Sequence, residues 1–140
     1  MLSLIVLAST LLAQSGSLPE FAGTWIAQVK GQPLARLELT VTNGEVQGQL
    51  SLAGMHVDAN GDVDNLIPDV GHTASIFDAT FRDSVLSFAT RDGDDTDHFK
   101  ARLVDGRVTL TFVVDAALRA ELAQEGIPAP RPIAMTRVSP

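Results

Sequence analysis

Apolar and polar residues alternate through most of the chain, and short turn sequences interrupt the alternation. Asn43-Gly44, Asn60-Gly61 and Asp105-Gly106 each lie between two alternating runs. Asn-Gly and Asp-Gly favour type I′ turns, because both central residues of such a turn need a positive φ. The pattern therefore predicts successive β-hairpins.

The hairpin at Asn43-Gly44 shows how strictly the pattern fixes the register. A two-residue loop places only apolar residues and glycine on one face, in the pairs Val41–Val46, Leu39–Gly48, Leu37–Leu50 and Ala35–Leu52. A slip of one residue would mix apolar and polar side chains on both faces. We therefore expect two antiparallel strands with one face in the core and one face in solvent.

Two further hairpins repeat the one-sided pattern. The turn at Asp105-Gly106 predicts the pairs Leu103–Val108, Ala101–Leu110 and Phe99–Phe112. A turn at Asp83-Ser84 predicts the pairs Phe81–Leu86, Ala79–Phe88 and Phe77–Thr90. Residues 23–29 are expected to form an opening strand, and residues 55–59 and 62–67 a shorter pair.

The period changes after Asp115, where residues 116–124 are strong helix formers. Asp115 is a candidate N-cap, and Gly126 ends the predicted helix. Three prolines then favour an extended link to a last strand at residues 133–138. The sequence thus predicts an all-β fold, an antiparallel up-and-down meander barrel of about eight to ten strands with one short helix before the last strand. Barrel closure would remove the sheet edges, and a β-sandwich is the competing solution.

The N-terminal residues 1–13 carry no charged side chain and contain an apolar stretch that is short for a membrane span. Small and polar residues follow, so we predict a signal peptide over residues 1–17, with cleavage near residues 13–15. A buried N-terminal helix or strand is the alternative. Residues 18–140 would form a single barrel domain, secreted or periplasmic, with no stable membrane span after cleavage.

Composition narrows the classes of function. The chain of 140 residues has 10 Lys and Arg against 17 Asp and Glu, a net charge of −7, which argues against a nucleic-acid partner. Eight of the ten cations are arginines, which are dispersed from Arg36 to Arg137 without a basic stripe. The chain has no Cys, which excludes disulfides, thiolate metal sites and cysteine nucleophiles. Export without disulfides suggests a bacterial envelope.

The segment Phe21-Ala22-Gly23-Thr24-Trp25 places a Gly-x-Trp motif at the start of the first strand. In an exported chain of this size built from hairpins, the motif resembles the calycin superfamily of lipocalins, fatty-acid-binding proteins and avidins. The resemblance implies that Gly23 and Trp25 close one barrel end, with Arg137 packed over the indole. Thr96-Asp97-His98 is similar to the Thr-Asp-Tyr segment of lipocalins. The resemblance covers residues 21–138 and implies a cup for a small apolar ligand.

The apolar face of the hairpins either lines such a cavity or forms the packed core of a small barrel. The ligand-lining candidates are Leu37, Leu39, Val41, Leu50, Phe77, Phe81, Phe88, Phe99, Leu103, Leu110 and Phe112. Gly48 and Ala79 on this face leave room for a ligand. No inward polar residue stands out to orient one.

Two groups of charged residues are candidates for other chemistry. Four carboxylates beside Gly93 could bind calcium through oxygen, or form a solvated acidic hairpin tip: Asp92, Asp94, Asp95 and Asp97. His56 shares a strand face with Asp58, so an imidazole–carboxylate contact is possible there. The sequence predicts no cofactor.

We therefore expect an exported, non-catalytic binding module of calycin-like shape for a small hydrophobic ligand. The first alternative is a solid-core envelope or protein-interaction domain without a small-molecule ligand, whose partner meets the acidic loops. The second is a small hydrolase or isomerase that uses His56 with an acid.

Overall fold

The structure is a computed structural model that describes residues 16–138. A 3₁₀ helix, η1 (Leu18–Phe21), precedes nine strands that form one antiparallel sheet: β1 (Gly23–Val29), β2 (Gln32–Thr42), β3 (Glu45–Val57), β4 (Val63–Ser75), β5 (Phe77–Arg82), β6 (Val85–Asp92), β7 (Asp95–Val104), β8 (Arg107–Val113) and β9 (Ile133–Arg137). Helix α1 (Ala116–Gln124) lies between β8 and β9. The predicted all-β meander with one helix before the last strand is confirmed. The predicted cleavage site lies outside the described residues.

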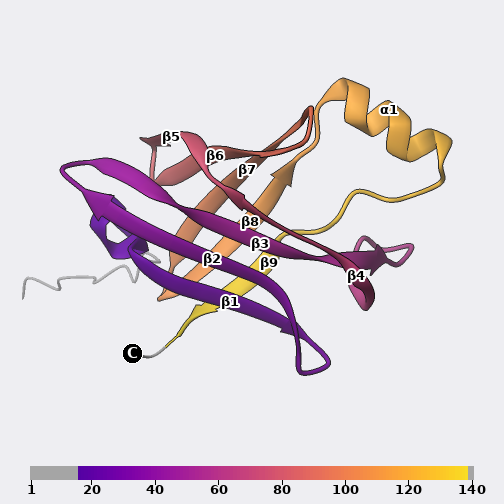
Figure 1. Ribbon diagram of the computed structural model, residues 1–140, viewed down its shortest axis with the longest axis horizontal. Helices are drawn as coiled ribbons and strands as arrows, with labels where there is room; N and C mark the ends of the chain where they lie inside the picture. Colours follow the sequence, from indigo (N-terminus) through magenta and orange to yellow (C-terminus); the bar gives the residue numbers. More distant parts are fainter. Residues whose placement is uncertain (1–15, 139–140) are drawn as a thin grey trace, which may run out of the picture.

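The first and last strands of the chain are neighbours in the middle of the sheet, whose order is β4-β3-β2-β1-β9-β8-β7-β6-β5. Every neighbouring pair is antiparallel, so β4 and β5 run in the same direction. Only Ile76 separates them. They are therefore one bent ribbon that leaves β3 and joins β6 (Figure 1).

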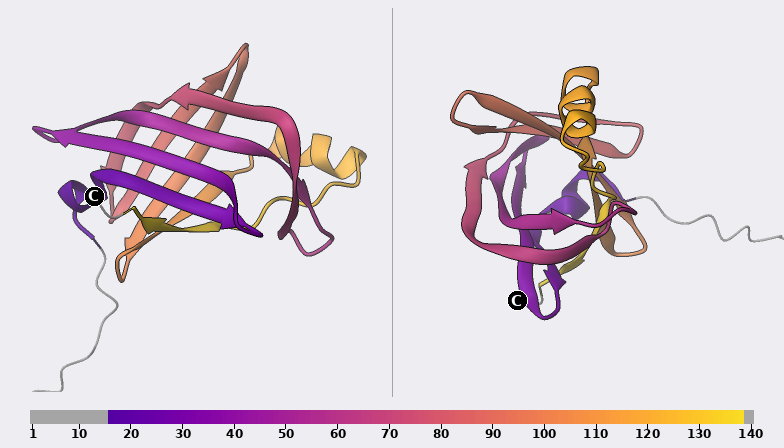
Figure 2. Two further views of the ribbon diagram at one scale, coloured as in Figure 1. Left: turned by 60° about the horizontal axis from the view of Figure 1, so that its bottom comes forward. Right: turned by 90° about the vertical axis from the view of Figure 1, so that its right-hand side faces the viewer.

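The bend corrects one part of the prediction. A barrel closed by hydrogen bonds was expected, but β4 and β5 do not pair and the sheet is not closed. The sheet nevertheless wraps around one interior, as the two views of Figure 2 show. Strands β2 and β3 cross in front of β6–β8 in Figure 1, so the apolar faces of the two halves meet.

The core lies between these halves and forms one continuous cluster. Its members come from η1 and from every strand except β4 and β5, together with the bend residue Ile76. The largest fully buried side chains are Trp25, Phe21, Phe99, Leu37, Leu86, Leu110, Met135 and Val108. Burial of a Leu or Phe side chain stabilises a fold by roughly 1.5–3 kcal/mol, so this cluster is the main favourable term in folding.

Two predicted hairpin registers are confirmed in full. The hairpin at Asn43-Gly44 has the expected pairs from Val41–Val46 to Ala35–Leu52. The hairpin at Asp105-Gly106 has those from Leu103–Val108 to Phe99–Phe112. In both cases a two-residue turn and one apolar face specify the same register, because any slip would expose the core side chains.

The third predicted register is correct only near its turn. Phe81 pairs with Leu86, but a bulge between Phe77 and Thr80 shifts the rest, and Phe77 pairs with Ala89 instead of Thr90. Asp78 sits in the bulge with φ 52°. Phe77 lies outside the core cluster, and the guanidinium of Arg91 covers its ring at 5.0 Å. Alternation alone could not reveal the extra residue.

The helix begins and ends where the sequence predicts. The carboxylate of Asp115 accepts a hydrogen bond from the backbone N–H of Leu118 at 2.8 Å, and Gly126 has a positive φ just beyond the end. No residue of α1 is buried. Figure 1 shows the helix projecting from one end of the sheet.

Gly48 gives a test of the wrapped register. A Cβ at Gly48 would lie 1.8 Å from the backbone oxygen of Glu38 on the neighbouring strand. This backbone oxygen can move away only if the strand itself shifts. We expect Gly48→Ala to lower the free energy of unfolding by at least about 2 kcal/mol in urea titrations. The neighbouring exposed Gln47→Ala is the control, expected to change it by less than about 0.5 kcal/mol. Equal stabilities of the two variants would contradict the register.

Candidate functional site

One end of the wrapped sheet is closed by η1 and an aromatic–cation pair. Trp25 is fully buried, and its indole N–H donates to the backbone oxygen of Phe21 at 2.9 Å. The guanidinium of Arg137 lies 4.4 Å from the indole ring centre and donates to the backbone oxygens of Ala22 and Glu20. Arg137 therefore fastens η1 to the last strand.

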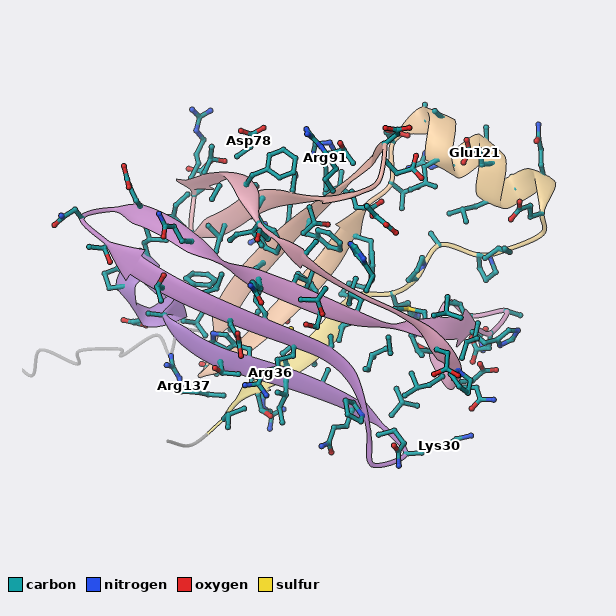
Figure 3. All side chains as sticks on the ribbon, viewed as in Figure 1. Lys30, Arg36, Asp78, Arg91, Glu121 and Arg137 are labelled. Carbon is teal, nitrogen blue, oxygen red and sulfur yellow. The ribbon has the colours of Figure 1, made fainter. Side chains whose placement is uncertain are left out.

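Gly23 belongs to the same arrangement. It has φ 128°, and a Cβ there would lie 2.8 Å from Nη1 of Arg137. The structure thus brings Gly23, Trp25 and Arg137 together at this closed end, and Figure 3 shows Arg137 beside η1 and β1. The side chain of Phe81, predicted to face inward, packs edge-on against Phe21 at a centroid distance of 5.8 Å and stays 36% exposed.

The predicted ligand-lining residues fall into two groups. Seven are buried and pack against one another in the core cluster: Leu37, Leu39, Leu50, Phe88, Phe99, Leu103 and Leu110. The other four are half-buried or exposed: Val41, Phe77, Phe81 and Phe112. Phe99 stacks on Phe88 and also contacts Phe112. These contacts are those of packed core, and contact of any of these residues with a ligand stays a prediction.

At the opposite, open end, the ladder between β3 and β4 breaks. Leu52 pairs with His72, whereas the next pair is Gly54 with Ile67, so residues 68–71 of β4 loop out opposite a single residue of β3. Pro68 suits the loop because it has no N–H to pair. Gly54 allows it, since a Cβ there would lie 2.7 Å from the Cβ of Val70.

This break produces a groove of about 460 Å³ between β4 and the β1–β2 turn, here called the mouth groove. Its apolar lining comes from Val29, Pro33, Ala53, Leu66, Ile67 and Pro68, and its polar lining from Lys30, Gln32, Asn65 and Asp69. Val29 and Leu66 also pack against the core cluster. Ile67 is 44% exposed and the adjacent Val70 61% exposed, and such exposed apolar groups mark interaction sites. Figure 3 shows Lys30 at the β1–β2 turn.

The acidic tip, defined as Asp92, Asp94, Asp95 and Asp97, lies at the same end beside α1. Nδ1 of His72 lies 3.8 Å from a carboxylate oxygen of Asp92, across the gap between β4 and β6. Partial desolvation, with the charges of Asp95 and Asp92, raises the pKa of Asp97 above its ordinary value, against the opposing effect of His72 and His98. Among residues 16–138, no three His, Asp or Glu side chains are arranged to hold a metal ion.

His56 has a different acidic partner from the predicted one. Its Nδ1 lies 2.7 Å from a carboxylate oxygen of Asp64 on β4, and this hydrogen bond is the main reason why the pKa of Asp64 lies below its ordinary value. Asp58 instead accepts hydrogen bonds from the backbone N–H groups of Asn60 and Asp62. The predicted His56–Asp58 contact is therefore wrong, because Asp58 is used by its own turn. The pair His56–Asp64 is exposed and lacks the dry surroundings that activate catalytic groups.

Two features escaped the sequence reasoning. The mouth groove depends on an irregular ladder, for which Pro68 and Gly71 inside an apparent strand were the available signals. Three dispersed cations, Arg82, Lys100 and Arg102, line one hollow on the outer face of β5–β7. Only the strand pairing brings them together.

Comparison with known proteins gives no further guidance: no protein-family model, curated protein or solved structure matches the chain. The calycin resemblance therefore rests on the residues already described. Within the described part of the chain, no helix has the length and apolar character needed to cross a membrane.

The closed end gives a testable prediction. Arg137→Met removes two charged hydrogen bonds and the cation over Trp25, so we expect the free energy of unfolding to fall by about 2–4 kcal/mol. Trp25 is the chain's one Trp, so its fluorescence reports unfolding in urea and its access to acrylamide. Arg131→Met removes an exposed contact with Asp62 and should cost less than about 1 kcal/mol. Equal losses in the two variants would contradict the role of Arg137.

The acidic tip gives a pH-dependent prediction. A carboxyl whose pKa is raised by folding favours the folded state below its ordinary value of 3.8 and loses that contribution as pH rises through its folded pKa. Asp97→Asn stays neutral, so we expect a higher melting temperature than the wild type at pH 7 and no difference at pH 3. Asp94→Asn controls for net charge. An equal rise of the melting temperature in Asp97→Asn and Asp94→Asn at pH 7 would contradict the specific role of Asp97.

Proposed function

We propose that the protein is an exported, non-catalytic binding module that holds a small, largely apolar ligand in the mouth groove. The observation that carries this proposal is the groove itself, about 460 Å³ and lined by a majority of apolar side chains with a few polar ones. Ligand sites of soluble proteins have volumes of roughly 300–1,000 Å³ and the same composition. The site therefore lies at the open end of the sheet rather than among the interior residues that the sequence suggested.

The rim of the groove favours an amphipathic ligand. Lys30 supplies an ammonium group at one side, and Asn65 and Gln32 supply amides that can both donate and accept hydrogen bonds. Asp69 lies on the same lining, so the charged end of an anionic ligand is favoured near Lys30 and disfavoured near Asp69. A medium-chain fatty acid or a similar hydrophobic carboxylate fits these requirements.

A second candidate function has its own support. A hollow of about 300 Å³ between the acidic tip and α1 is lined by Asp92, Asp95, Asp97, Asp115 and Glu121. Leu118 and Val113 in the same lining are exposed. This combination suits a basic, partly apolar segment of an envelope protein, in agreement with the alternative of an interaction domain.

Two fluorescent probes test the mouth groove: a dansyl-labelled medium-chain fatty acid and the neutral dye Nile red. We expect Ala53→Trp, which fills the groove, and Ile67→Glu, which charges its exposed rim, to weaken both probes at least about tenfold. Lys30→Gln should weaken only the fatty acid. Gln47→Trp, which puts the same indole on an exposed position of the same strand, is the control and should leave both affinities unchanged.

Native mass spectrometry of the protein purified from producing cells adds an independent readout, since a bound lipid should be present in the wild type and absent in Ala53→Trp. Unchanged probe binding in both groove variants would refute the proposal. Salt-sensitive capture of a protein, lost in Asp92→Asn with Asp94→Asn but kept in Ala53→Trp, would favour the second candidate.

A further inference from the structure

The outer face of β5–β7 carries a hollow that is chemically unlike the mouth groove. It has a volume of about 560 Å³, and three cationic side chains line it: Arg82, Lys100 and Arg102. The hydroxyl groups of Thr80 and Ser87 share the lining. We call this site the cationic hollow. The chain has a net charge of −7, so three cations in one hollow are unexpected. Their positive potential favours a ligand of opposite charge.

Strand pairing explains how distant residues converge there. Arg82 pairs with Val85, and Val85 pairs with Arg102, so the two guanidinium groups flank Val85 on one row. The adjacent row runs from Thr80 through Ser87 to Lys100. Neighbouring strands lie about 4.8 Å apart, which puts Arg82 and Arg102 about 10 Å apart across the sheet. Long side chains from both sides can therefore reach one anion above Val85.

These cations are not neutralised by the rest of the described chain. Within residues 16–138, two Arg side chains form ion pairs with carboxylates, and both lie outside the hollow. They are Arg36, with Glu38, and Arg131, with Asp62. None of the three cations of the hollow has a carboxylate side chain of residues 16–138 within ion-pair distance. Asp83 lines the hollow without closing such a pair, so its carboxylate partly offsets the positive charge.

We propose that the cationic hollow binds a phosphate group of a soluble ligand. A phosphate offers three charged oxygens in a tetrahedral arrangement, enough to accept from two guanidinium forks, an ammonium and a hydroxyl at once. A carboxylate has two oxygens in one plane and would leave part of this donor set unused. The cationic hollow shares no lining residue with the mouth groove. This proposal is therefore independent of the proposed function.

The surroundings favour a soluble ligand over a lipid surface. Asp83 lies in the hollow itself, whereas Arg107, which pairs with Val104 on the next strand, lies outside its lining. A flat anionic bilayer would have to approach the carboxylate of Asp83 as closely as the three cations. A compact phosphate can instead sit over Val85 and avoid it.

Titration of inorganic pyrophosphate into the ¹⁵N-labelled full chain, followed by two-dimensional NMR at low salt, tests the site. We expect saturable shifts at residues 80–87 and 98–104. Lys100→Gln with Arg102→Gln should lower the affinity at least about tenfold. Asp83→Asn should raise the affinity, an outcome that a misfolded variant cannot produce. Arg36→Gln, which removes a cation from the outer face of β2, is the matched control. It should change neither the set of shifted residues nor the affinity for pyrophosphate.

The proposal is overturned if Arg36→Gln weakens binding as much as the double variant, if Asp83→Asn gives no gain, or if the shifts map elsewhere. Two further arms cover other occupants. Sedimentation with phosphatidylglycerol vesicles that depends on Lys100 and Arg102, without any pyrophosphate shift, would assign the hollow to a membrane. Salt-sensitive self-association lost in the same variant, again without a pyrophosphate shift, would assign it to the acidic tip of a second copy.

Discussion

A meander with one apolar face can bury that face only if the sheet wraps onto itself, and here the ribbon β4–β5 provides the turn. Both strands run in one direction and are separated by Ile76 alone, whose own side chain is buried in the core. The N–H of Ile76 still donates to the oxygen of Gly48 on β3, and the next residues already pair with β6. A strand that passes from one half of a sheet to the other is the usual way to build such a corner. Without this bend, the apolar faces of β1–β3 and β6–β8 would have no common interior.

The bend also makes the two ends of the molecule unequal. At one end, Arg137 ties η1 to the last strand over a fully buried Trp25, so the closed end is rigidly specified. At the other end, residues 68–71 interrupt the pairing of β4 with β3, and residues 67–73 are exposed. Binding surfaces tend to come from the less stable parts of a fold, because they must remain accessible. The mouth groove lies at this end because the irregular β3–β4 ladder that interrupts the sheet also opens the space.

How much of this could be read from the sequence depends on which residues set each feature. The registers of the hairpins at Asn43-Gly44 and Asp105-Gly106 were predicted pair by pair from a two-residue turn and one apolar face, and the Asp115 cap was predicted from local chemistry. The bulge at Asp78 and the loop at residues 68–71 could not be predicted. Each inserts extra residues into one strand, and the alternation of apolar and polar residues does not reveal the insertion. The actual partner of His56 was missed for a related reason: Asp64 reaches it only across the β3–β4 pairing. The same limit hid the cationic hollow, whose three cations come from two strands that are not neighbours.

Net charge is a poor guide to such a surface because the strands keep opposite charges apart. On β6 and β7 the inward positions run from Phe88 and Phe99 to Thr90 and Asp97, and then to Asp92 and Asp95, so acidic groups occupy the inner row at the open end. Lys100 and Arg102 alternate with the core residues and therefore face outward. Three residues along β7 separate the nearest members, Asp97 and Lys100, which is roughly 10 Å and still exceeds the Debye length of about 8 Å at physiological ionic strength. The charges of the acidic tip are therefore largely screened from the cationic hollow, which lies on a separate face of an acidic protein.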